Sequence, residues 1–302
     1  MLQDPVQRPT AREVLEELIR IDASTRIDGP VVLYPRGYTL PASCAMISVL
    51  AAAVPDNAAI RAVAAAAELH IQASSVQGII QACGVSALEA QSIFVYTASQ
   101  GPFVCPTHGA PFASYNKALR DAAADSVHAW SGYSFLLVNA LTKLPSVACT
   151  VYRGLDCALS EVSHLYRKGG FVWYRSPTST TVDKDKTMAS FGAGAAGGAG
   201  TFIELRVQNA KEIEAFSAVP GEQERLLAPN TCFKVLECFS ASQIHRMQGF
   251  AALPANVDLV VLEEVRHLST HDVCSWMIVL TVVQVTQDNA NYASAILAST
   301  AP

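Results

Sequence analysis

The sequence predicts an α+β fold in which helices come first and strands follow. Up to residue 144 the apolar residues recur mainly at helical spacing, and beyond it the periodicity becomes that of strands. A block of helices followed by a block of strands is typical of an α+β domain and not of an alternating parallel α/β fold. The chain has 302 residues, 51% of them hydrophobic and 16% charged. That is enough to bury a full core in one large domain or two small ones.

The N-terminal region, residues 1–27, contains one predicted helix. Thr10 and Glu13 have the spacing of a capping box, and apolar residues at helical spacing follow to about residue 21. Residues 4–10, Asp-Pro-Val-Gln-Arg-Pro-Thr, resemble the last stretch of a protein kinase C-lobe. The catalytic-loop and metal-binding motifs of a kinase are missing from the sequence, so an active kinase is excluded.

Residues 28–85 form an Ala-rich region in which we find no chemistry. Glycines and prolines over 28–42 indicate an irregular connector. Residues 43–83 predict two or three helices, divided at 55–57 and at 74–75. We expect this neutral surface to shield the rest of the chain or to contact another protein.

From residue 86 the helices have clearer boundaries. Ser86 and Glu89 have the spacing of a second capping box, which predicts a helix through Tyr96. After a loop over 101–111, further helices are expected from Tyr115 to Arg120 and over residues 133–144.

Strands are expected in the second half, with one short helix among them over residues 156–167. The strand-like segments are 148–152, 169–174, 201–207, 232–239 and 257–265.

Charge and composition argue against several classes of partner. The net charge of −5 disfavours a surface for polyanions, so no nucleic-acid partner is expected. The longest apolar run, residues 273–285, has 13 residues, fewer than the roughly 20 that a membrane helix needs. No basic start followed by an apolar core marks a secretory signal at Met1, so a cytoplasmic location is the expectation.

The eight cysteines contain no C-x-x-C pair. Cys105 and His108 have the only close metal-type spacing, and no second ligand pair accompanies them. No metal site is predicted.

Two glutamates, Glu222 and Glu224, stand two residues apart after a Pro-Gly turn. In an extended backbone both carboxylates project to one face and can enter one cleft. Alone, a Glu-Gln-Glu turn is more often an exposed polar loop. Two earlier positions change this assessment, because Arg153 ends a predicted strand and Ser179 lies in a Thr-Ser-Thr-Thr run after another.

An arginine, a serine and an E-x-E pair in this order resemble the R-S-E constellation of the arginine-specific mono-ADP-ribosyltransferases, which use NAD. The resemblance extends over about residues 86–265 and includes the helical stretch from Tyr115 to Arg120. It implies helices packed on a split, mostly antiparallel β-sandwich, with a catalytic domain over 86–265 and a peripheral tail over 266–302.

The resemblance also implies a role for each residue. Glu224 would stabilise the charge that develops on the ribose as the nicotinamide bond breaks. Glu222 would orient and deprotonate an acceptor guanidinium, which favours arginine over cysteine or asparagine. Arg153 and Gly154 would bind NAD, Arg153 through a planar fork of donors that suits a pyrophosphate. Ser179 would position the cofactor and Glu224 without nucleophilic attack. The expected partners are NAD and a protein arginine.

Two other functions fit the same residues. An NAD glycohydrolase would cleave NAD with water as the acceptor, and a catalytically silent binding module would keep the fold without turnover. Because all four key residues are present, we favour an enzyme over the silent module.

Two residues depart from the pattern of the family, and one segment matches the motif of a different kind of site. Pro177 stands where the family usually has an aromatic residue, and Arg225 replaces an apolar residue after Glu224. Residues 192–197 match G-x-G-x-x-G, but a helix is predicted before them and a strand after them. This order is the reverse of the dinucleotide-binding fingerprint, so we interpret the segment as a flexible loop.

Overall fold

The computed structural model describes residues 31–265 except 42, 56–57, 106–108, 195–198, 220, 245, 248–249 and 251–252, and only the backbone of 190–194. The chain divides into two compact units, Met1–Glu264 and Val265–Pro302, and every described helix and strand belongs to the first. The predicted helix over 10–21, the kinase-like stretch and the apolar run over 273–285 lie outside the described residues.

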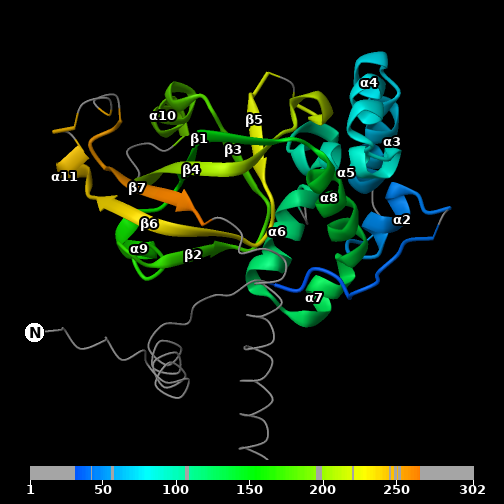
Figure 1. Ribbon diagram of the computed structural model, residues 1–302, viewed down its shortest axis with the longest axis horizontal. Coiled ribbons are helices and arrows are strands. Elements are labelled where there is room, and N and C mark those ends of the chain that lie inside the picture. The colour runs from blue at the N-terminus through cyan, green and yellow to red at the C-terminus, as the bar shows by residue number, and fades with distance from the viewer. Residues whose placement is uncertain are drawn as a thin grey trace, which may run out of the picture. The chain divides into compact units, whose positions relative to one another are not determined.

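The first half of the described chain is helical, as predicted (Figure 1). The helices are α2 (Met46–Ala51), α3 (Ala58–Ile71), α4 (Ser74–Cys83), α5 (Ala87–Thr97), α6 (Pro111–Asp121), α7 (Ala124–Ala129) and α8 (Ser131–Lys143), with a 3₁₀ turn at Gly101–Phe103. The short α7 was not predicted, and α6 begins four residues before the expected Tyr115.

Local sequence accounts for several helix ends. The Ser86 hydroxyl accepts a hydrogen bond from the Glu89 amide at 3.3 Å, and the Glu89 carboxylate accepts one from the Ser86 amide at 2.6 Å. This is the predicted capping box of α5. Gly84, with φ +65°, ends α4 in the left-handed conformation that glycine adopts without strain.

The second half forms one seven-stranded sheet in the order β1-β3-β5-β4-β7-β6-β2, in which β1 also pairs with β4. The strands are β1 (Ser146–Leu155), β2 (Phe171–Tyr174), β3 (Thr178–Thr181), β4 (Gly200–Glu212), β5 (Glu224–Leu227), β6 (Thr231–Phe239) and β7 (Val257–Glu264). Short helices lie between them: α9 (Leu159–Val162), α10 (Lys184–Gly194), a 3₁₀ turn at Glu214–Phe216, and α11 (Ala241–Ile244).

Pairing closes part of this sheet on itself. Strands β1, β3, β5 and β4 form a ring of antiparallel neighbours, and β7, β6 and β2 extend the sheet from β4. Among the described pairings, β4–β7 is the parallel one. The α+β class, with helices packed on a mostly antiparallel, folded sheet, is therefore confirmed.

Three hydrophobic clusters hold the unit together. The largest lies among the helices and includes three residues from the sheet half, Ile213, Phe216 and Leu226. A second lies inside the folded sheet around Val151 and Phe233. The third packs α10 and α11 on the outer face of β4 and β7.

The structure corrects several predicted boundaries. Strands β1 and β4 are longer than expected because they pair with each other from Ser146↔Lys211 to Leu155↔Thr201. The helix expected over 156–167 is confined to Leu159–Val162. Strands β3 and β5 were not predicted as strands, since each has only four residues, too few to show a clear period.

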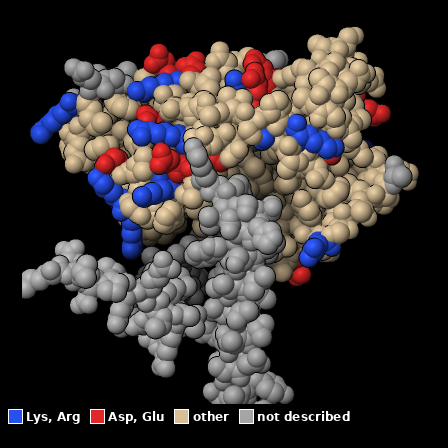
Figure 2. Space-filling model, viewed as in Figure 1, with Lys and Arg blue, Asp and Glu red and all other residues tan. Residues whose placement is uncertain are grey.

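In the described part of the chain no single helix has the length and apolar character to cross a membrane. Helices α4 and α5 reach that length and composition only as a pair, bent by 117°. On the face shown in Figure 2, basic and acidic side chains are interspersed over the sheet half, and the region of α3 and α4 is mostly uncharged.

Candidate active site

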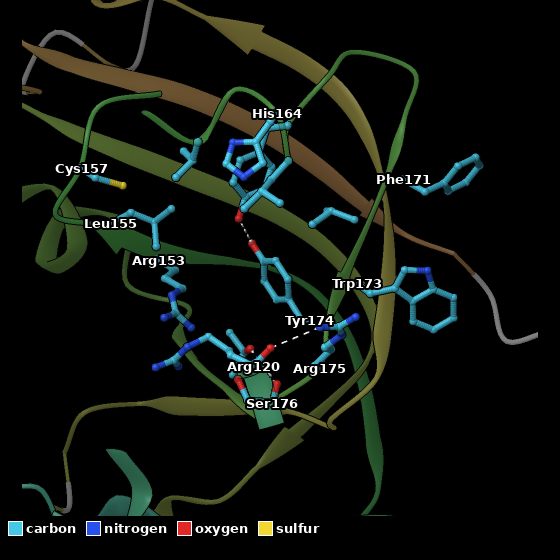
Figure 3. Close-up of a pocket in the computed structure, with 15 residues that line it drawn as sticks. Arg120, Arg153, Leu155, Cys157, His164, Phe171, Trp173, Tyr174, Arg175 and Ser176 are labelled. Atoms are coloured by element: carbon cyan, nitrogen blue, oxygen red, sulfur yellow. Dashed lines mark hydrogen bonds between the residues drawn. The ribbon is translucent and has the colours of Figure 1, made fainter. Parts of the chain in front are cut away.

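A cavity of about 400 Å³ opens at the end of β1, against β2 and the segment that joins these two strands. Three arginines line it: Arg120 from α6, Arg153 from β1, and Arg175, which directly follows β2. Figure 3 shows these arginines on one side of the cavity, with His164 and Cys157 on the other. The hydroxyl groups of Tyr166 and Tyr174 lie 3.1 Å apart on its wall. The cavity thus combines a cationic end with a mainly apolar and aromatic wall.

Arg153 owes its position to the alternation of β1. It is paired with Ile203 of β4 and shares its strand face with Val151, which is fully buried inside the sheet. The next residue on this face, Leu155, also lines the cavity. Strand β1 therefore carries the Arg153 guanidinium to the place where the interior of the sheet opens. The next residue, Gly154, is paired with Phe202 of β4.

Ser179 and Glu224 lie together on the neighbouring strands β3 and β5. The register places Thr181 opposite Glu224 and Ser179 opposite Leu226. The Ser179 hydroxyl donates a hydrogen bond to Glu224 Oε1 at 2.5 Å. Two of the predicted site residues, 45 positions apart in the chain, are thus in direct contact.

Glu224 is the buried carboxylate of the site, with 6% of its surface exposed. Desolvation raises the pKa of its carboxyl group, the nearby charge of Glu222 raises it further, and the hydrogen bond from Ser179 opposes both effects.

The two glutamates do not alternate along one extended strand, so the expected geometry of the pair is wrong. Gly221 has φ +87° and Gln223 has φ +49°, and β5 begins only at Glu224. The left-handed residue between the glutamates turns the chain, so Glu222 is half-exposed on a turn whereas Glu224 is buried. The Thr181 hydroxyl donates to the Glu222 carbonyl at 3.2 Å and ties this turn to β3.

The segment before the turn is bound to the helices. The Ala218 amide donates to Thr97 Oγ1 of α5 at 2.8 Å. His70 Nε2 of α3 lies 3.1 Å from the carbonyl oxygen of Ala215. The helical half therefore fixes the path of the chain that leads to Glu222.

Tyr96 of α5 lies among the charged groups of the site. The charges of Arg153, Glu224 and Arg120 all act on the pKa of its hydroxyl group. Of the three arginines that line the cavity, Arg153 was predicted as a site residue, and Arg120 and Arg175 were not. The predicted catalytic residues, Ser179, Glu222 and Glu224, do not line the cavity. Arg153 is thus the predicted site residue that lines the cavity, and the Tyr96 hydroxyl is hydrogen-bonded to Pro177, two residues before Ser179.

Arg120 and Tyr96 were not among the predicted site residues. For Arg120 the available signal was its place at the end of the stretch from Tyr115 to Arg120, which belongs to the resemblance described above. Tyr96 gave no such signal, since its buried position on α5 is also typical of a core residue.

The two departures from the expected pattern have structural explanations. The Pro177 carbonyl accepts a hydrogen bond from the Tyr96 hydroxyl at 2.7 Å. The Arg225 guanidinium pairs with Glu212, Nη2 to Oε2 3.3 Å, and donates through Nη1 to the Glu224 carbonyl oxygen at 3.2 Å. Arg225 is therefore bound to another carboxylate and to the main chain of Glu224.

The glycine-rich segment and the Cys105–His108 pair are each only partly described. The first three residues of the glycine-rich segment, 192–194, are the end of α10 and not part of a loop, and residues 195–198 lie outside the described residues. Because β4 begins at Gly200, the predicted order of helix before strand holds. His108 is likewise not described. Within the described residues no three His, Cys, Asp or Glu side chains are grouped so as to hold a metal ion.

Comparison with known proteins identifies a family. A family model described as NAD:arginine ADP-ribosyltransferase matches residues 59–248. This range contains the cavity, Arg153, Ser179 and both glutamates. A search of curated protein sequences finds no match.

Solved structures align with this chain at low sequence identity, and the first of the three described next has a similar fold. The type III effector XopAI from Xanthomonas axonopodis pv. citri aligns with a TM-score of 0.53 and 15% identity, over 86% of this chain and 95% of that one. The ADP-ribosyltransferase HopU1 of Pseudomonas syringae pv. tomato DC3000 aligns with a TM-score of 0.47 and 22% identity, over 60% and 78% of the two chains. Vis toxin, an ADP-ribosyltransferase from Vibrio splendidus, aligns with a TM-score of 0.44 and 20% identity, over 72% and 91%.

Proposed function

The chain belongs to the NAD:arginine ADP-ribosyltransferase family, and from this we propose that it transfers ADP-ribose from NAD to arginine side chains of proteins. NAD-dependent ADP-ribosyl transfer follows from the family, and the arginine acceptor is our proposal. The observation that carries it is the half-exposed Glu222 beside the buried Glu224.

NAD is proposed to bind with its pyrophosphate at the cationic end of the cavity. Arg153 and Arg120 supply planar guanidinium groups there, which suit two linked phosphates. The volume of about 400 Å³ and the apolar wall suit a bound small molecule. Gly154, which follows Arg153 in β1, is a further candidate for contact with the cofactor.

Glu224 is proposed to assist cleavage of the bond between nicotinamide and ribose. As this bond breaks, its electron pair leaves with nicotinamide and positive charge develops at the ribose. A preformed carboxylate stabilises that charge most strongly where water is excluded, and Glu224 is buried. The hydrogen bond from Ser179 holds the carboxylate in one orientation and favours its ionised form.

Glu222 is proposed to serve the acceptor. A guanidinium has a pKa above about 12 and is a poor nucleophile until a carboxylate orients it and accepts a proton. Nitrogen of the acceptor then forms the new bond to the ribose, and its proton passes to Glu222. The exposure of Glu222 on its turn allows an arginine of a separate protein to reach it.

The Glu222→Gln variant tests the arginine acceptor. It removes the charge and keeps the shape, so transfer to agmatine should fall by ~10² or more, the usual scale for a lost general base. Hydrolysis of NAD to free ADP-ribose should persist at a substantial fraction of the wild-type rate. Both products can be quantified by chromatography in one reaction.

Glu214→Gln is the matched control. It removes a carboxylate from the same loop but keeps an oxygen that can accept the hydrogen bond from the Gly221 amide, so both activities should be retained. If Glu222→Gln lost both activities together, the proposed division of roles would be wrong. If the wild type released ADP-ribose but never modified agmatine, the protein would be an NAD glycohydrolase.

A further inference from the structure

We infer that Tyr96 is a positioning residue, which holds Arg120 of α6 and the Ser179–Glu224 pair in fixed relation through two hydrogen bonds. The inference rests on the proposed use of these residues for NAD. Tyr96 itself does not line the cavity, and its hydrogen-bond partners are Pro177 and Asn116, not the two glutamates.

The hydrogen bonds of Tyr96 can be assigned from chemistry alone. Its hydroxyl lies 2.7 Å from the Pro177 carbonyl oxygen and 3.1 Å from the amide nitrogen of Asn116. A carbonyl can only accept, so the single hydroxyl proton points to Pro177. The hydroxyl oxygen must then accept from Asn116 Nδ2. Asn116 Oδ1 is buried and has no partner among the described residues, so Tyr96 is the polar anchor of this amide there.

On the sheet side, the hydrogen bond from Tyr96 to the Pro177 carbonyl holds the start of β3. Pro177 has a restricted φ and stands two residues before Ser179, so fixing its carbonyl limits how Ser179 can be presented. On the other side of Ser179, the Thr180 hydroxyl donates to the Arg225 carbonyl oxygen at 2.7 Å. The strand is therefore anchored before and after the residue that binds Glu224.

On the helix side, the same hydroxyl fixes the rotation of α6. Asn116 and Arg120 are four residues apart, so they lie on the same face of the helix. With Asn116 bound to Tyr96, Arg120 is directed toward the cavity that it lines with Arg153. One hydroxyl group thus connects a proposed phosphate ligand with the proposed catalytic carboxylate.

The environment of Tyr96 suits a permanent link. The residue is 4% exposed, and burial raises the pKa of its hydroxyl to about 12, against smaller lowering effects from Asn116, Arg153 and Arg120. The hydroxyl therefore keeps its proton, and both hydrogen bonds, throughout the neutral pH range. A phenylalanine would fill the same space, so the function of the hydroxyl is separable from packing.

The Tyr96→Phe variant tests the inference. Misplacement of a catalytic group by about 1 Å can cost ~10²-fold in rate, so we expect kcat for NAD cleavage to fall by ~10-fold or more. Tyr133→Phe is the matched control, because Tyr133 is 1% exposed and its hydroxyl donates to the Ser92 carbonyl at 2.9 Å among the helices. Both variants should lose a similar few degrees of melting temperature, and only Tyr96→Phe should lose turnover.

Asn116→Ala separates the two connections. It releases α6 but leaves the bond from Tyr96 to Pro177, so KM for NAD should rise several-fold with a smaller change in kcat. NAD cleavage is measured without an arginine acceptor, so failure of the acceptor proposal would not affect this test. Equal turnover of Tyr96→Phe and wild type, or an equal loss in Tyr133→Phe, would overturn the inference.

Discussion

Glu224 is a carboxylate that the fold buries and supplies with a single hydroxyl donor from Ser179. Its pKa is raised, first by desolvation. A group whose pKa is higher in the folded state stabilises the protein while protonated, and this contribution is lost as pH rises through the folded-state pKa. Ionised Glu224 therefore costs stability at neutral pH. Such a cost is expected of a charge kept in a dry site for electrostatic catalysis.

Glu224→Gln should consequently be more stable than wild type at pH 8, with a higher melting temperature. The difference should shrink as pH falls through the raised pKa of Glu224. NAD cleavage should drop by ~10²–10³, the usual cost of one electrostatic stabiliser, and in the wild type it should increase as pH rises through the same pKa. Thermal melts at several pH values and a cleavage assay measure these effects.

Glu263→Gln is the control for charge alone, because Glu263 is exposed on β7. It should change neither the pH dependence of the melting temperature nor NAD cleavage. A Glu224→Gln variant less stable than wild type at pH 8 would contradict the assigned cost of burial.

The turn before β5 determines how the two glutamates differ. Gln223 has φ +49°, which side chains branched at Cβ adopt only with strain, whereas glycine adopts it freely. Glu224 is held separately by the pairing of β5 with β3. The turn therefore orients Glu222 without being needed to place Glu224.

Gln223→Val should reduce arginine transfer by ~10-fold, because strain of about 1–3 kcal/mol would reshape the turn. NAD cleavage should be affected less. Gln223→Gly tolerates the same backbone and should retain both activities. Chromatography of reactions that contain agmatine and NAD measures both activities, and normal transfer by Gln223→Val would show that the turn does not orient Glu222.

At the scale of the whole compact unit, the helices and the sheet share one core. Phe216, 1% exposed, comes from the segment between β4 and β5 and packs into the cluster formed by the helices, together with Ile213 and Leu226. The hydrogen bond from Ala218 to Thr97 crosses the same boundary. The two halves are therefore expected to unfold together.

Phe216→Ala should lower the free energy of unfolding by about 3–5 kcal/mol, the usual cost of removing a buried phenylalanine side chain. Phe171→Ala, at a residue 54% exposed, is the control and should change it little. Chemical denaturation followed by fluorescence and circular dichroism should show one coincident transition for each protein. Two separate transitions in the wild type would mean that the shared cluster does not couple the halves.

Much of the fold was accessible from the sequence because its signals are local. The capping box at Ser86 and the helical spacing after it predicted α5, and the strand-like apolar segments 232–239 and 257–265 predicted β6 and β7. Strands β3 and β5 were missed because their four residues are held by pairing with neighbouring strands and not by their own pattern. The length of β1 likewise depends on its partner β4.

For the site, the sequence determined which groups are present. Arg153, Ser179, Glu222 and Glu224 are named by their order and flanking residues, and their roles remain proposals. Only the tertiary structure decided their arrangement, because it depends on contacts between distant positions. Ser179 reaches Glu224 across 45 residues, and Tyr96 reaches Pro177 across 81. The backbone at Gln223 is left-handed and separates the half-exposed Glu222 from the buried Glu224. A glutamine at that position does not predict this conformation, which occurs where the turn meets the paired strand β5.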